Sequence, residues 1–121
     1  MQITSYRDLM VWQKSMSLAL ATYELTEQFP KSEMYGLSSQ MRRAAVSIPS
    51  NIAEGKARGT RKDYRHFLLN SFGSGAELET QIEIARRITK TKSLSYEPAE
   101  LLLVEILKML HSLISKLEAN G

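Results

Sequence analysis

QMRRAAVSIPSNIAEGKARGTRKDYRH, at residues 40–66, predicts a helix with a proline at its centre, then a short basic turn, then the beginning of a second helix. Thr60, with Asp63 three residues later, resembles a capping box that marks the start of the second helix. Gly55 and Gly59 loosen the junction between the two. The first helix is indicated by apolar residues that recur every three or four positions: Leu37, Met41, Ala44, Ile48 and Ile52.

Pro49 is the costly residue of this stretch. Proline has no N–H for the carbonyl of Ala45 and its ring crowds that carbonyl, which costs about 3 kcal/mol in a helix interior. We therefore expect the helix to bend at Pro49. Either the packing of the bundle requires this bend, or a hydrogen-bond donor elsewhere satisfies the freed carbonyl. Gly73 and Gly75 raise the same question in the next helix, because each costs about 1 kcal/mol relative to alanine. Close approach of the two helices would explain them and would let Glu77 pair with Arg43 or Arg42.

A polar stripe runs beside the apolar one. On a helical wheel it covers an arc of about 80°. Such a stripe is either a solvated face or a partly buried hydrogen-bond network, which would specify one arrangement of the helices. Its members are Gln40, Arg43, Ser47, Asn51, Glu54 and Arg58.

Positive charge concentrates in the same stretch. Residues 40–66 carry seven basic and two acidic side chains, a net +5, whereas the rest of the chain sums to −2 and the whole to +3. The cations either are solvated and suppress self-association, or neutralise phosphates of RNA or DNA. The seven candidates for nucleic-acid binding are Arg42, Arg43, Lys56, Arg58, Arg61, Lys62 and Arg65.

Helical spacing extends over the rest of the chain. Apolar residues step by three or four positions over 9–23, 64–85 and 103–117, and no segment alternates with period two. Ser5 with Asp8 resembles a capping box, Phe29-Pro30 ends the first helix, residues 91–95 connect the last two, and Pro98 suits a first helical turn. Connections this short make neighbouring helices antiparallel. We therefore predict an all-α fold, an up-down-up-down four-helix bundle, as one domain over residues 1–121.

Composition narrows the class of protein. Of 121 residues, 43% are hydrophobic and 24% charged, and cysteine is absent, which fits a globular chain without disulfides or a cysteine zinc site. Arg7, Asp8 and Lys14 interrupt any apolar signal-peptide run. Glu105 and Lys108 interrupt the most apolar segment, 101–117, so no membrane span is expected. We predict a soluble, cytoplasmic protein.

The last helix has an apolar arc of roughly 160°, wider than the usual stripe of about 100°. Its face is either well buried within one small bundle or packed partly against another subunit. The residues concerned are Leu102, Leu103, Ile106, Leu107, Met109, Leu110, Leu113, Ile114 and Leu117.

Catalysis is not predicted. His66 and His111 lack a glutamate three residues before them, so the Glu-x-x-His pairs of di-iron bundles are absent. No glycine-rich loop follows a strand. A hydrolase using Glu77 and Glu79 would lack a nucleophile, a base and a metal set. We expect no catalytic residue, metal or cofactor.

Three segments resemble a known family. YRDLMVWQKS at 6–15, LTEQFPKSEMYGLSSQMRRAAVSIPSNIAEG at 25–55 and FLLNSFGSGAELETQI at 67–82 resemble the bacterial 23S rRNA intervening-sequence (S23) proteins, four-helix bundles. The resemblance implies a homopentamer, with no established catalytic residues. A related branch, the accessory variability protein of diversity-generating retroelements, is a basic pentamer that associates with reverse transcriptase and nucleic acid. The positions that match the family signature are Arg42, Arg43, Ser47, Pro49, Asn51, Glu54, Gly55, Gly73, Ser74, Glu77 and Glu79.

Together these observations predict a non-enzymatic, homo-oligomeric, ring-shaped bundle that binds structured RNA or DNA through the seven basic residues. The alternative is a scaffold or accessory subunit for a protein partner such as a reverse transcriptase, with the charge incidental. Salt distinguishes the two, because binding through phosphate contacts weakens steeply as salt rises. The expected structural network or subunit interface comprises Ser47, Pro49, Asn51, Glu54, Gly73, Ser74 and Glu77.

Overall fold

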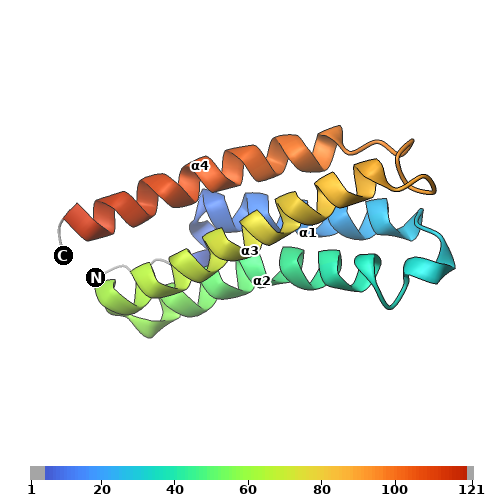
Figure 1. Ribbon diagram of the computed structural model, residues 1–121. Coiled ribbons are helices and arrows are strands. Elements are labelled where there is room, and N and C mark those ends of the chain that lie inside the picture. The colour runs from blue at the N-terminus through green and yellow to red at the C-terminus, as the bar shows by residue number, and fades with distance from the viewer. Residues whose placement is uncertain (1–4, 120–121) are drawn as a thin grey trace.

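Figure 1 shows the computed structural model, which describes residues 5–119. Within this range the chain forms four α-helices and two short 3₁₀ turns, and no β-strand. The helices run alternately up and down, each packs on its neighbours in chain order, and the last closes on the first. The predicted four-helix, all-α architecture is confirmed, and the predicted domain, 1–121, extends at both ends beyond the described residues. The helices are α1 (Met10–Glu27), α2 (Leu37–Arg58), α3 (Arg61–Arg87) and α4 (Glu97–Ala119).

The start of α1 differs from the prediction. The Ser5 hydroxyl accepts from the N–H of Arg7 at 3.1 Å and caps a 3₁₀ turn, η1 (Tyr6–Asp8), so the expected capping box with Asp8 is wrong. Leu9 is extended, and α1 begins only at Met10. The helix ends at Glu27, shortly before Pro30, as proline geometry requires. A second 3₁₀ turn, η2 (Lys31–Glu33), lies in the connection to α2.

Three buried hydroxyls of α1 bond within their own helix. Ser15, Thr22 and Thr26 donate to the carbonyls four residues earlier, at 2.6, 2.8 and 2.8 Å. Each hydroxyl thereby has an acceptor within α1, and only that of Thr26 also accepts a hydrogen bond from another helix, from Arg42 of α2. The polar residues of the α1 core face therefore cost little when buried.

The predicted apolar stripe of α2 forms the centre of the core. Met41, Ala45, Ile48 and Ile52 have no solvent exposure, and α2 continues through Pro49 to Arg58 without interruption. Full burial of a side chain the size of isoleucine contributes about 1.5–3 kcal/mol. The stripe therefore fixes which face of α2 points inward.

Two glycines permit close packing and one permits a turn. A Cβ at Gly55 would lie 2.7 Å from Cβ of Phe67, and one at Gly75 would lie 2.6 Å from Cδ2 of Leu107. Gly59 adopts φ 86°, the left-handed conformation that ends α2. The close approach expected at Gly73 is wrong, because a Cβ there would meet nothing within 4 Å.

The end of α3 and the start of α4 are joined by an ordered connection at 88–96. The hydroxyl of Thr91 donates to the carbonyl of Ala85 at 2.6 Å, and the hydroxyl of Tyr96 donates to the carbonyl of Thr91 at 2.7 Å. All nine residues of the wide apolar arc on α4 are buried or half-buried within this one chain. No helix within the described range is long and apolar enough to cross a membrane.

Candidate functional site

A small polar network joins α2 to α3, and it includes Ser47 and Asn51 of the polar stripe, whereas Gln40, Arg43, Glu54 and Arg58 of the same stripe are exposed. The amide of Asn51 donates to the hydroxyl and the carbonyl of Ser47, at 2.9 and 2.8 Å. The hydroxyl of Ser74 donates to the hydroxyl of Ser47 at 2.9 Å. All three residues are partly or fully buried, so these bonds fix the height of α3 against α2.

A second hydroxyl, which the sequence reasoning missed, lies beside Pro49. Ser71 is fully buried and donates to the carbonyl of Ile48 at 2.8 Å. Within residues 5–119 no side chain donates to the carbonyl of Ala45, the one that the proline deprives of its usual donor. Pro49 itself is buried in the bundle, which supports packing as the reason for its presence.

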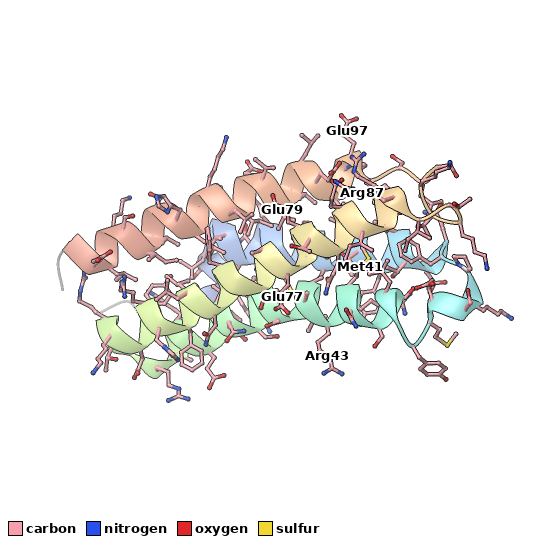
Figure 2. All side chains as sticks on the ribbon, viewed as in Figure 1. Met41, Arg43, Glu77, Glu79, Arg87 and Glu97 are labelled. Carbon is pink, nitrogen blue, oxygen red and sulfur yellow. The ribbon has the colours of Figure 1, made fainter. Side chains whose placement is uncertain are left out.

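Arg42 fastens α2 to α1. Its Nε donates to the hydroxyl of Thr26 at 2.7 Å, its guanidinium lies 4.6 Å from the centre of the Tyr23 ring, and Nη2 is 3.8 Å from a carboxylate oxygen of Glu27. The hypothetical pair with Glu77 is therefore wrong for Arg42. Arg43 points away from the bundle (Figure 2), and it forms no ion pair with any described residue.

Five of the seven basic candidates gather at the α2–α3 turn. We call Lys56, Arg58, Arg61, Lys62 and Arg65 the basic end of the bundle. The other two, Arg42 and Arg43, precede Lys56 by 14 and 13 residues, respectively. At 1.5 Å per helical residue they lie about 20 Å from it along the helix axis. The seven residues therefore do not form one surface.

Most cations of the basic end contact the bundle itself. Arg58 pairs with Glu54 at 2.9 Å, and this bond raises the pKa of the Arg58 guanidinium. Its guanidinium also lies 5.0 Å from the Phe67 ring centre, and the Lys56 ammonium lies 5.4 Å from that of Tyr64. Burial raises the pKa of the Tyr64 phenol.

Two arginines of α3 contact the last turns of α4. Arg61 donates to the carbonyls of Lys116 and Leu117 at 3.4 and 3.3 Å, and Arg65 pairs with Glu118 at 3.2 Å. Cations are favourable at a helix C-terminus, where carbonyls lack helical partners. Lys62 is exposed and pairs with no described acidic residue.

An exposed apolar surface on α1 and α2 was not predicted. Met16 and Tyr23 fall on the helical spacing of a core stripe, yet they are 38% and 43% exposed. They line grooves between α1 and α2, and Val46 of α2 contributes to the same surface. The phase of α1 places these residues at the rim of the core stripe, a distinction that spacing alone does not make.

Residues 5–119 contain no group of three or more His, Cys, Asp or Glu side chains arranged to hold a metal. A model of the family described as 23S rRNA-intervening sequence protein matches residues 7–112. No curated protein matches the sequence.

Proposed function

Because the chain belongs to the family of 23S rRNA-intervening sequence proteins, we propose that it acts without catalysis, as a ring of five copies that binds structured RNA. The observation that carries the RNA proposal is the basic end, where five cations lie within ten residues of sequence. Backbone phosphates supply most of the affinity in nonspecific nucleic-acid binding, and they require clustered cations of this kind.

The basic end keeps a positive balance after its internal contacts. Its cations face three acidic residues, Glu54, Asp63 and Glu118, and the contacts of Arg61 go to neutral carbonyls. In a ring with cyclic symmetry, the same end of every bundle lies on the same rim. Assembly would therefore multiply a modest positive charge into a continuous basic rim.

The test is fluorescence anisotropy with a labelled RNA hairpin, measured at salt concentrations between about 50 and 200 mM. We expect the logarithm of affinity to fall linearly with the logarithm of salt. Lys62→Gln should weaken binding and reduce the slope by about 1 for each phosphate contact it removes. Lys90→Gln, an exposed lysine in the connection at the opposite end, is the matched control and should leave the slope unchanged.

An absence of binding near 50 mM salt by an assembled protein would refute the RNA proposal. That result would favour the alternative, a scaffold for a protein partner. A wild-type protein that remains monomeric would refute the ring.

A further inference from the structure

Two different sides of the bundle expose grooves of opposite charge. One groove lies between α1 and the outer face of α2, and the other lies along α3 beside α4. We call the first the basic face, defined by Tyr23, Met34, Tyr35, Arg42, Arg43 and Val46. We call the second the acidic face, defined by Glu79, Glu83, Ile84, Arg87, Glu100 and Val104.

The basic face combines exposed apolar side chains with arginine. Tyr35 is 93% exposed, and Val46, Met34 and Tyr23 are also exposed around the groove. The charged side chains that line this groove are Arg42 and Arg43. Arg42 already contacts Thr26 and Glu27, whereas Arg43 keeps its charge unpaired within the described chain.

The acidic face has the complementary arrangement. Ile84 and Val104 are exposed aliphatic residues there. Glu83 pairs with Arg87, and Glu100 pairs with Arg86 on the side of the groove. Glu79, which Figure 2 shows between α3 and α4, has no ion-pair partner in the described range. Each face therefore presents aliphatic surface and one unpaired charge, positive on one and negative on the other.

The two unpaired charges lie at the same height along the bundle. The hydrogen bond between Ser47 and Ser74 aligns α2 with α3. From that point, Arg43 is four residues and Glu79 five residues toward the end that carries both the α1–α2 and α3–α4 connections, about 6 and 7.5 Å. A contact between the two faces would therefore place successive copies side by side, with only a small translation along the helix axes.

We propose that the basic face of one copy binds the acidic face of the next, with Arg43 opposite Glu79. This inference rests on the homo-oligomer proposed above and identifies the surfaces that form it. The contact is head-to-tail, because each subunit uses two different faces, and such contacts close into rings when the rotation permits. A two-fold dimer through the basic face would instead place Arg43 against a second Arg43, which is unfavourable.

The test uses one aspartate substitution on each face and native mass spectrometry at a fixed protein concentration. Val46→Asp and Ile84→Asp should each abolish assembly and give a monomer. An equimolar mixture of the two should give dimers with one copy of each, because each variant keeps the face that the other has lost. Met10→Asp, at an exposed methionine of α1 outside both faces, is the control and should keep the wild-type mass.

Circular dichroism establishes that each variant is folded. If an aspartate variant unfolds, the charge reversals Arg43→Glu and Glu79→Arg replace it, since neither side chain has an ion pair within the described chain. Each reversal should weaken assembly, and the two combined in one chain should restore it. Assembly that survives both aspartate variants, or that only one of them disrupts, overturns the head-to-tail contact. A monomeric wild-type protein would instead refute the proposed oligomer itself.

Discussion

The packing of α2 against α3 at Gly55 yields a quantitative prediction. An alanine there would place its Cβ 2.7 Å from Cβ of Phe67 and 3.3 Å from the carbonyl oxygen of Tyr64, atoms that move only with the α3 backbone. Overpacking of this kind costs about 1–3 kcal/mol. The better helix propensity of alanine returns about 1 kcal/mol at most. We expect Gly55→Ala to lower the free energy of unfolding by about 1 kcal/mol.

Gly73→Ala is the matched control, since its Cβ would meet nothing within 4 Å. It should raise the free energy of unfolding by about 0.5–1 kcal/mol through helix propensity alone. Thermal unfolding followed by circular dichroism at one protein concentration measures both variants, and 1 kcal/mol corresponds to about 4 °C in Tm for a chain of this length. If Gly55→Ala unfolds at or above the temperature of Gly73→Ala, the helices do not approach as closely as described.

Three further predictions test individual contacts by urea unfolding. Ser71→Ala should lower the free energy of unfolding by about 0.5–1.5 kcal/mol, because the buried hydrogen bond from its hydroxyl to the carbonyl of Ile48 is lost; an unchanged free energy of unfolding would contradict that bond. Arg42→Ala should destabilise the fold by about 1–2 kcal/mol, while Arg43→Ala stays within about 0.5 kcal/mol, and equal effects would rule out the anchoring role of Arg42. Burial holds the pKa of the Tyr64 phenol above its ordinary value of 10.0, so the contribution of the neutral buried phenol to the free energy of unfolding is complete below that pH and is lost as pH rises through the folded pKa. Tyr64→Phe should lessen this alkaline loss without a cost at pH 7, since the buried hydroxyl has no hydrogen-bond partner among residues 5–119, whereas Tyr96→Phe should cost about 1 kcal/mol by removing the bond to Thr91.

The sequence predicted the features that local chemistry determines. Pro30 and the left-handed Gly59 end helices whatever surrounds them, and the Thr60 cap accepts the N–H of Asp63 at 3.1 Å as expected. The apolar spacing of α2 likewise identified its core, because 3.6-residue periodicity decides which face can be buried. The hydrogen bonds between Ser47 and Asn51 could be predicted for the same reason, because they join residues four apart on one helix.

The contacts between helices were harder to predict. The partner of Arg42 depends on how the connection at 28–36, with its 3₁₀ turn, sets α1 against α2, and no residue of α2 encodes that offset. The cations of α3 looked available for phosphates, but Arg61 and Arg65 contact the end of α4, more than 50 residues away in sequence. Their proposed role in RNA binding therefore depends on charge that remains after these contacts.

The hydroxyls of α1 that bond within their own helix have a consequence for local unfolding of the native protein. The hydroxyls of Ser15 and Thr22 bond only within α1. The polar contacts that link α1 to other helices are few, and they include the Arg42–Thr26 hydrogen bond and the Lys14–Glu105 ion pair at 3.0 Å. The α2–α3 pair, by contrast, is joined by buried hydrogen bonds and close glycine packing. Local opening with a low free energy begins where such links are few. In native-state hydrogen exchange, the amides of α1 should therefore lose protection before those of the α2–α3 hairpin, which forms the slowest-exchanging unit of the chain.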